Sequence, residues 1–293
     1  MAYRFGLLGY PLSYSLSPQI HQVFLDECGF QGTYELIPVA VNDQTNEQLN
    51  VVLQQLRQGD YDGLNVTIPH KQAVRSRLDD LDDQARVVGA VNTIYRTRTG
   101  LRGTNTDIEG FLVDLAKLIS PTESGTALVL GAGGAARAIA YGLLTSGWQV
   151  WIAARRVEQA DQILQDLATR AQFTESMRTL AMNEGLNLSS EEAKAIRLVV
   201  NATPLGTKGL EMGSPLSSFR GFSEGTCFYD LVYNPPETTF LRQARQQGYP
   251  ARNGLGMLIH QAALAFECWT GCKITITPEL ESKIITRIDL NHD

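Results

Sequence analysis

The sequence predicts an α/β protein of two domains, each built around a sheet covered by helices. The chain has 293 residues, and length alone suggests about two domains at roughly 150 residues per domain. Short runs typical of strands alternate with helical patterns along most of the chain, as they do in parallel sheets with helical crossovers. A glycine cluster also opens one of these helices.

The elements expected in the front part of the chain follow from apolar spacing and from turn residues. Leu49, Val52 and Leu56 recur at helical spacing. Pro69 stands at a plausible first position of a helix, and Asp107 at a plausible cap. The expected elements are strands at 3–9, 34–41 and 63–67, a helix at 44–58, a hairpin of 91–96 with 101–104, and a helix at 108–119.

The back part of the chain contains a βαβ unit and a helical tail. Residues 172–192 are polar with little periodicity, so they are expected to form a helical excursion or a surface loop and are assigned no role. The expected elements are strands at 126–130, 149–153, 197–201 and 226–232, and helices at 135–145, 256–270 and 279–289.

Composition excludes several classes of protein. A net charge of −6 argues against a general nucleic-acid binder, which needs a basic face. Four cysteines in this length predict reduced, partly buried thiols, and none has histidine nearby at zinc-site spacing. The first nine residues lack the pattern of a secretory signal, and the longest uncharged stretch, 138–154, is interrupted by polar and glycine residues. We expect a cytoplasmic protein without a membrane partner.

The glycine cluster fits a dinucleotide-binding turn. Gly131, Gly133 and Ala136 match G-x-G-x-x-G/A, which permits a tight turn, close approach of a pyrophosphate and close packing of helix on strand. The turn follows one strand, opens a helix and precedes a second strand, so a Rossmann-type domain is expected. The residues expected to approach the cofactor here are Gly131, Ala132, Gly133, Gly134 and Ala135.

The end of the second strand of this unit indicates NADP. A site that prefers NAD places Asp or Glu there for the ribose 2′-hydroxyl, whereas this chain has Ala154, Arg155 and Arg156. Guanidinium groups suit a 2′-phosphate through their charge and forked donors. An alternative is that both arginines merely begin a solvated helix.

Four further clusters carry polar residues suited to a small substrate. Ser15 and Ser17 could direct two hydroxyls at a carboxylate, and a polar run ending at Lys71 follows a strand, where ligands of open α/β sheets gather. The clusters are 9–21, 65–71, 89–110 and 254–261.

These clusters, in this order, resemble the shikimate dehydrogenases along nearly the whole chain. The runs 65–71, 103–107 and 254–271 are specific to that family, whereas the glycine motif is not. The resemblance implies reduction of 3-dehydroshikimate to shikimate with NADP and without a metal. It implies a substrate-binding domain of residues 1–106 and 254–293, an NADP-binding domain of residues 107–253, a cleft between them, and a monomer or homodimer.

The resemblance also assigns residues to roles. Ser15 and Ser17 would hold the substrate carboxylate, and Lys71 with Asp107 would form the catalytic pair. Met257 would pack near the nicotinamide. The other residues expected around the substrate are Asn65, Thr67, Asn92, Tyr233 and Gln261, and those expected near the cofactor are Asp83, Leu231 and Gly254.

Lys71 suits the chemistry that the resemblance implies. A positioned ammonium group stabilises the oxyanion that forms at a ketone and then donates the proton. Neighbouring residues on a helix point in different directions, so His70 is expected at the surface or behind the site, and His21 and His260 are expected to be packed rather than catalytic.

The sequence departs from the family pattern at two places, and two other functions remain as alternatives. Gln22 stands where the family usually has Asn, and 154–156 read Ala-Arg-Arg where it often has Asn-Arg-Thr. A quinate/shikimate dehydrogenase that uses NAD is disfavoured by the arginines. A non-catalytic dinucleotide sensor is disfavoured by the presence of both Lys71 and Asp107.

Overall fold

The computed structural model describes residues 2–41, 47–171, 173, 176–182 and 186–290, which form two compact units. The first unit comprises Met1–Thr106 and Ile259–Asp293, and the second comprises Asp107–Leu258. The chain therefore passes between the units at 106/107 and at 258/259, where the sequence prediction has 106/107 and 253/254.

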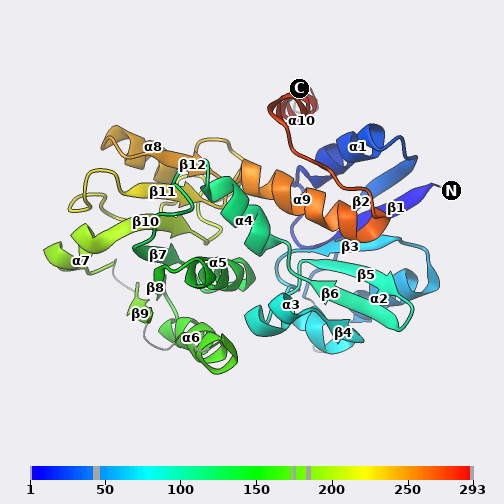
Figure 1. Ribbon diagram of the computed structural model, residues 1–293, viewed down its shortest axis with the longest axis horizontal. Coiled ribbons are helices and arrows are strands. Elements are labelled where there is room, and N and C mark those ends of the chain that lie inside the picture. The colour runs from blue at the N-terminus through cyan, green and yellow to red at the C-terminus, as the bar shows by residue number, and fades with distance from the viewer. Residues whose placement is uncertain (1, 42–46, 172, 174–175, 183–185, 291–293) are drawn as a thin grey trace. The chain divides into compact units, whose positions relative to one another are not determined.

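The first unit is built on a six-stranded mixed sheet in the order β2-β1-β3-β5-β6-β4 (Figure 1). β1 pairs in parallel with β2 and β3, while β5 runs antiparallel to β3 and forms a hairpin with β6. The strands are β1 (Tyr3–Gly9), β2 (Gly32–Pro38), β3 (Gly63–Val66), β4 (Asp80–Leu81), β5 (Thr93–Thr97) and β6 (Gly100–Thr104).

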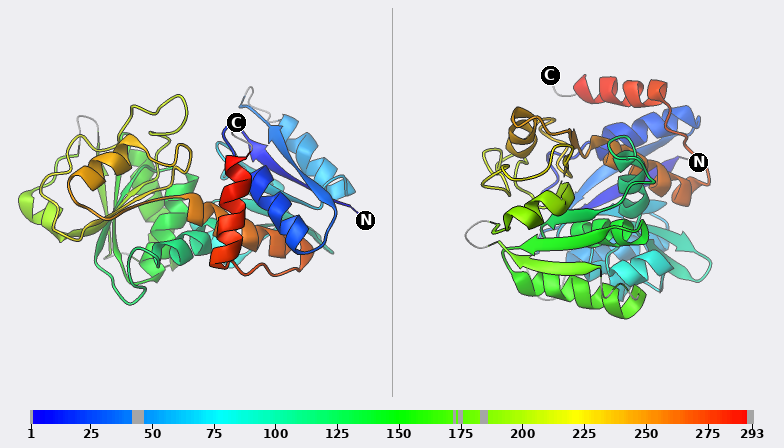
Figure 2. Two further views of the ribbon diagram at one scale, coloured as in Figure 1. Left: turned by 90° about the horizontal axis from the view of Figure 1, so that it is seen from above. Right: turned by 60° about the vertical axis from the view of Figure 1, so that its left-hand side comes forward.

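Helices cover this sheet because their apolar residues recur on one face. In α2, the buried residues Leu49, Val52, Leu53 and Leu56 join a core with Leu64 of β3. Helix α10 packs beside α1 (Figure 2). The helices are α1 (Ser17–Glu27), α2 (Glu47–Gln58), the 3₁₀ helix η1 (Ala73–Arg77), α3 (Asp83–Val88), α9 (Leu255–Thr270, which begins in the second unit) and α10 (Pro278–Asp289).

The second unit is a parallel six-stranded sheet in the order β12-β11-β10-β7-β8-β9. The central strand β7 is buried along its whole length, as expected for a strand covered on both faces. The strands are β7 (Thr126–Leu130), β8 (Gln149–Ala154), β9 (Met177–Ala181), β10 (Ile196–Asn201), β11 (Cys227–Asp230) and β12 (Ala251–Asn253). The helices are α4 (Asp107–Leu115), α5 (Gly134–Thr145), α6 (Val157–Ala171), α7 (Ser190–Ala195) and α8 (Thr239–Gln246).

The region 172–192 was wrongly expected to lack a strand. It contributes β9, the edge strand that pairs with β8, and the start of α7. Only half of the surface of an edge strand is covered, so the apolar signal of β9 is weak. Residues 172, 174–175 and 183–185 of this region are not among the residues that the structure describes. Elsewhere in the chain, helices α3, α6 and α8 were not predicted.

Pro69 does not open an α-helix, contrary to the prediction. Residues 68–72 form turns, with the His70 amide donating to the Thr67 carbonyl oxygen at 2.9 Å, and only the 3₁₀ helix η1 follows. Tertiary contacts hold this loop in place of a helix, because Val91 donates to the Lys71 carbonyl oxygen at 2.7 Å.

The prediction that all four cysteines are free is also wrong. Cys28, at the end of α1, forms a disulfide with Cys272, just after α9, whereas Cys227 and Cys268 are free thiols. The partners are 244 residues apart in sequence, so the fold and not the spacing brings them together.

Candidate active site

The turn between β7 and α5 is shaped to admit a phosphate. Gly131 has φ of +113°, donates its amide to the Ala153 carbonyl oxygen at 2.8 Å, and would bring a Cβ to 3.0 Å from the Ala202 carbonyl oxygen. At Gly133, by contrast, a Cβ would meet nothing within 4 Å. The open space before Gly133 is therefore what a ligand approaching the backbone would use.

Helix α5 points its first turn toward this open space. Gly133 is its N-cap, and the first amides of a helix carry a partial positive charge that favours phosphate. Ala136 is fully buried, which allows the helix to pack closely on the sheet. Arg137, in the same turn, forms an ion pair with Asp166 at 2.6 Å. The residues present therefore fit a pyrophosphate.

Arg155 and Arg156 directly follow β8 and both are exposed. Ala154, the last residue of the strand, is buried. Two exposed guanidinium groups at the carboxyl end of this strand can pair with the 2′-phosphate that distinguishes NADP from NAD. Neither position holds the acidic side chain that would bind the ribose 2′-hydroxyl of NAD. The arrangement fits NADP better than NAD.

A buried carboxylate joins the loops that follow β10 and β11. Asp230 accepts hydrogen bonds from Asn201 Nδ2 at 2.9 Å, the Val232 amide at 3.0 Å and Thr238 Oγ1 at 2.6 Å. Burial raises the pKa of Asp230 to about 7, although these three hydrogen bonds lower it. The network holds both loops at the carboxyl edge of the parallel sheet, where α/β proteins bind ligands.

Three of the remaining residues predicted near the cofactor lie in the second unit: Leu231 after β11, Gly254 after β12 and Met257 in α9. Gly254 lies so close to Leu231 that a Cβ would be 2.4 Å from the Leu231 carbonyl oxygen. Met257, in the first turn of α9, is 7% exposed, and Tyr233 is half-buried. The structure brings Leu231 and Gly254 together within the second unit.

In the first unit, Asn65 lies in a buried polar network. Its Nδ2 donates to the Asn92 carbonyl oxygen and to Thr93 Oγ1, both at 3.1 Å, and its Oδ1 accepts from Tyr34 Oη at 2.9 Å. The three partners come from β2 and from the segment that leads into β5. Asn65 is thus held in one orientation at the end of β3.

The network continues from Asn92 to Thr106, the last residue of the first segment of this unit. Asn92 Nδ2 donates to Thr106 Oγ1 at 2.9 Å and to Gln261 Oε1 at 3.3 Å, and Asn92 Oδ1 accepts the Thr106 amide at 2.8 Å. Asn65, Asn92 and Gln261, predicted from three separate motifs, therefore share one network. Thr93 and Thr106 belong to those motifs without having been predicted as site residues, whereas Tyr34 lies in none of them.

Ser15 and Ser17 lie together at the start of α1. The Ser15 hydroxyl contacts the Ser17 hydroxyl at 3.2 Å and accepts from the Ser17 amide at 3.3 Å. Both residues are largely buried, at 9% and 5% exposure. Two adjacent hydroxyl groups and a helix start are suited to a carboxylate.

Lys71 and Thr67 lie in the loop after β3, and both are half-buried. His70, between them, was expected at the surface or behind the site, and the structure excludes the first of these: it is 1% exposed, and its Nε2 lies 2.7 Å from the Val39 carbonyl oxygen. This bond and the backbone bond from Val91 to Lys71 fix the loop that carries the lysine.

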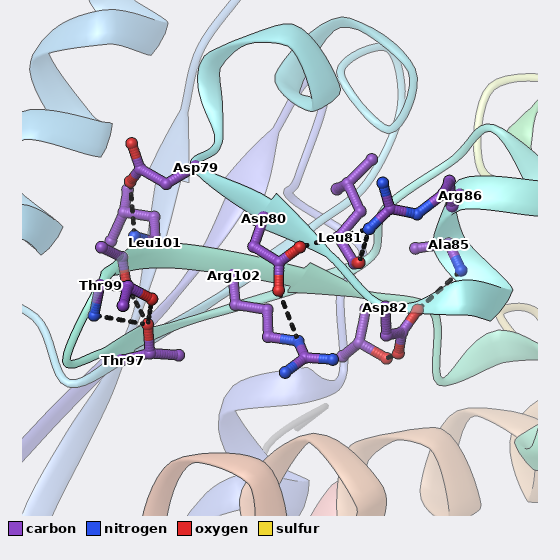
Figure 3. A network of polar contacts seen from close by, with 12 residues as sticks. Asp79, Asp80, Leu81, Asp82, Ala85, Arg86, Thr97, Thr99, Leu101 and Arg102 are labelled. Carbon is purple, nitrogen blue, oxygen red and sulfur yellow. Dashed lines mark hydrogen bonds and ion pairs between the residues drawn. The ribbon is translucent and has the colours of Figure 1, made fainter.

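Asp83 lies at the exposed start of the short helix α3, in the first unit. The preceding Asp82 caps this helix by accepting the Ala85 amide at 2.7 Å and also accepts from the Thr104 hydroxyl (Figure 3). The surrounding acidic side chains pair with arginines and backbone amides, so they act as caps and ion pairs.

His21 is fully buried and stacks on Tyr34, with ring centroids 4.3 Å apart. Burial lowers the pKa of His21 to about 3, against a smaller opposing effect of Asn65. The ring is therefore neutral at physiological pH and is packed behind Asn65, which suits a structural role.

The predicted site residues divide between the two units. Lys71 belongs to the first unit, and Asp107 is the first residue of both the second unit and α4. Among the described residues, no group of His, Cys, Asp and Glu is arranged as metal ligands would be. The described helices are too short or too polar to cross a bilayer.

Comparison with known proteins relates both ends of the chain to one family. Residues 7–94 match the shikimate dehydrogenase substrate binding domain, and residues 254–274 match the shikimate 5′-dehydrogenase C-terminal domain. A shikimate dehydrogenase (NADP(+)) of Carboxydothermus hydrogenoformans is 37% identical over 266 residues, which is 91% of this chain and 91% of the relative.

Solved structures show the same fold. The shikimate 5-dehydrogenase of Thermus thermophilus, in complex with NADP(H) and shikimate, has a TM-score of 0.81 and 36% identity over 98% of this chain and 99% of that one. The quinate dehydrogenase of Corynebacterium glutamicum, in complex with NAD, has a TM-score of 0.83 and 29% identity over 97% of this chain and 99% of that one. The fold alone thus does not distinguish between the two cofactors.

Proposed function

Because this chain belongs to the shikimate dehydrogenase family, we propose that it interconverts 3-dehydroshikimate and shikimate with NADP. The observation that carries this proposal is the buried network joining Asn65, Asn92 and Gln261. Three amide side chains held in fixed orientations can recognise the hydroxyl groups of a polyhydroxylated ring. The paired hydroxyls of Ser15 and Ser17 suit its carboxylate.

Lys71 and Asp107 are proposed as the catalytic pair. NADPH, when bound, supplies the hydride that the ketone carbon accepts. The Lys71 ammonium group stabilises the negative charge that develops on the ketone oxygen and gives that oxygen a proton. The role proposed for Asp107 is to hold the lysine by a charge-assisted hydrogen bond and to accept a hydrogen bond from a substrate hydroxyl. Thr106, anchored to Asn92, directly precedes Asp107 in the chain.

The cofactor preference is proposed to rest on Arg155 and Arg156. Reduction of NADP and of NAD by shikimate, followed by absorbance with the purified protein, tests both the activity and the preference. We expect kcat/KM for NADP at least about tenfold above that for NAD, because a hydrogen bond to a charged group such as the 2′-phosphate contributes about 1.5–3 kcal/mol and about 1.4 kcal/mol corresponds to a factor of ten.

Replacing both arginines by alanine should raise the Michaelis constant for NADP and leave that for NAD nearly unchanged. A faster reaction of quinate with NAD would support the alternative dehydrogenase. Binding of NADP without turnover of either acid would support a non-catalytic sensor. A monomeric or homodimeric state and a cytoplasmic location stay predictions from the sequence.

A further inference from the structure

The second unit contains a fully buried carboxylate that the proposed chemistry does not use. Asp114 lies on α4, two helical turns after Asp107, and is 0% exposed. Its carboxylate accepts hydrogen bonds from Arg252 Nε at 2.8 Å, from Arg252 Nη2 at 2.7 Å and from the Tyr229 hydroxyl at 2.7 Å. Lys117 Nζ is 3.8 Å from the same carboxylate. These contacts connect α4 to β11 and β12.

Tyr229 extends the cluster toward the start of α9. Its ring packs edge-on against Phe111 of α4, with centroids 5.2 Å apart. Burial and the adjacent Asp114 carboxylate raise the pKa of Tyr229 well above the usual range, so the phenol keeps its proton and donates a hydrogen bond to Asp114. The backbone of Met257 lies near enough to this phenol to oppose the rise in its pKa. One side chain thus contacts both α4 and the first turn of α9.

Gly256 shows how closely α9 begins against this carboxylate. A Cβ built at Gly256 would lie 1.9 Å from Asp114 Oδ1, so no larger residue fits without moving the helix. Removing one partner of a buried pair is strongly destabilising, whereas apolar residues of similar volume often replace the whole pair without loss. A buried ion pair is therefore weak evidence for a role in stability, whereas a forked Arg–carboxylate pair fixes geometry.

We propose that Asp114, Arg252 and Tyr229 form a positioning cluster for hydride transfer. The cluster sets the axis of α4, whose first residue is Asp107, and the first turn of α9, which carries Met257. None of the three touches substrate or cofactor in this scheme. The inference rests on the proposed function, since it assumes that Asp107 and Met257 take part in the reaction.

The test compares Tyr229→Phe and Arg252→Lys with a matched control. Tyr229→Phe keeps the ring and removes only the hydroxyl, and Arg252→Lys keeps the charge and loses the fork. The control is Tyr249→Phe in the same unit, which loses one hydrogen bond from its hydroxyl to the Phe222 carbonyl oxygen. Steady-state kinetics with shikimate and NADP are measured together with amide hydrogen exchange of α4 and of the Met257 amide.

Tyr229→Phe and Arg252→Lys should lower kcat about 10- to 100-fold, because small misplacements of reacting groups have effects of this size. KM for NADP should change less than about threefold, since uniform binding is not removed. Amide hydrogen exchange in the first turns of α4 and α9 should be faster in the Tyr229→Phe variant than in the parent protein, and it should be unchanged in the Tyr249→Phe variant.

The outcomes separate this inference from the proposed function. If the parent protein turns over shikimate and both variants keep its kcat, the positioning role is wrong while the function stands. If the parent protein does not turn over shikimate, the proposed function is wrong and the positioning role for hydride transfer is overturned with it. If the parent is active, amide hydrogen exchange that stays unchanged in Tyr229→Phe would overturn the inference, whereas a lower kcat together with faster exchange at both helix starts would support it.

Discussion

Lys71 is the residue on which the proposed proton transfer depends. Lys71→Ala should lower turnover about 10²- to 10⁴-fold, the range that a general acid contributes. NADP binding should stay near the parental value, because the glycine turn and both arginines are unchanged. Kinetics and NADP titration check this, with Lys273→Ala, an exposed lysine of the same unit, as the control. Turnover within a few-fold of the parent would remove Lys71 from the mechanism.

His21 should make the protein sensitive to acid. Its pKa is about 3 in the folded protein against 6.5 unfolded, so the unfolded state binds the extra proton between these values. Stability from the neutral ring is complete above pH 6.5 and falls by about 1.4 kcal/mol per pH unit below it. Urea unfolding between pH 7 and pH 4 measures this slope. His21→Phe should have a shallower slope, and equal slopes would contradict the assignment.

The resemblance to a family indicated much of the site but not its connections. It assigned Asn65, Asn92 and Gln261 to the substrate, and the structure joins these three residues in one network. Tyr34 was missed because a tyrosine on a half-buried strand is ordinary. The sequence left open whether His70 is exposed or buried, because its partner, the Val39 carbonyl oxygen, is 31 residues away in sequence.

At the scale of elements, the start of α8 is coupled to the loop after β11. Thr238 Oγ1 accepts the Leu241 amide at 3.2 Å as the helix cap and donates to Asp230 at 2.6 Å. One hydroxyl therefore closes the helix and satisfies a buried carboxylate. This double role explains why Thr238 is 1% exposed although it is polar.

Thr238→Val should lower the free energy of unfolding by about 2 kcal/mol, since a lost cap contributes about 1 kcal/mol and an unsatisfied buried acceptor about as much again. Thr238→Ser keeps the hydroxyl and should recover most of this loss. Chemical denaturation of the three proteins checks the prediction. Equal losses in the valine and serine variants would show that the methyl group, not the hydroxyl, matters.

Element boundaries followed from the sequence where periodicity was strong. The strands at 3–9 and 126–130 were predicted with the bounds that β1 and β7 have. Among the failures were β9, with its weak edge pattern, and Pro69, whose loop is held by contacts to distant segments. Local propensity does not contain either kind of information.

At the scale of the whole molecule, the Cys28–Cys272 disulfide closes a loop of 244 residues in sequence. A cross-link over so long a loop restricts the unfolded chain, and such bonds typically contribute about 2–5 kcal/mol. A reductant should therefore lower the melting temperature of the parent protein.

The matched variant is Cys28→Ser, which should melt at the lower temperature with or without reductant. Alkylation of the unfolded, unreduced parent should modify two cysteines, Cys227 and Cys268, because the other two are bonded. Modification of all four thiols, together with melting that does not respond to the reductant, would contradict the disulfide.

The sequence by itself determined the α/β class, the glycine turn after β7, the arginines after β8 and the family. These depend on local spacing, because a glycine turn needs its glycines and a strand its periodicity. Only the tertiary structure decided the Cys28–Cys272 bond, the burial of His70 and the cluster around Asp114. Each of these joins residues that are far apart in the chain, and packing of distant segments, not local propensity, sets such contacts.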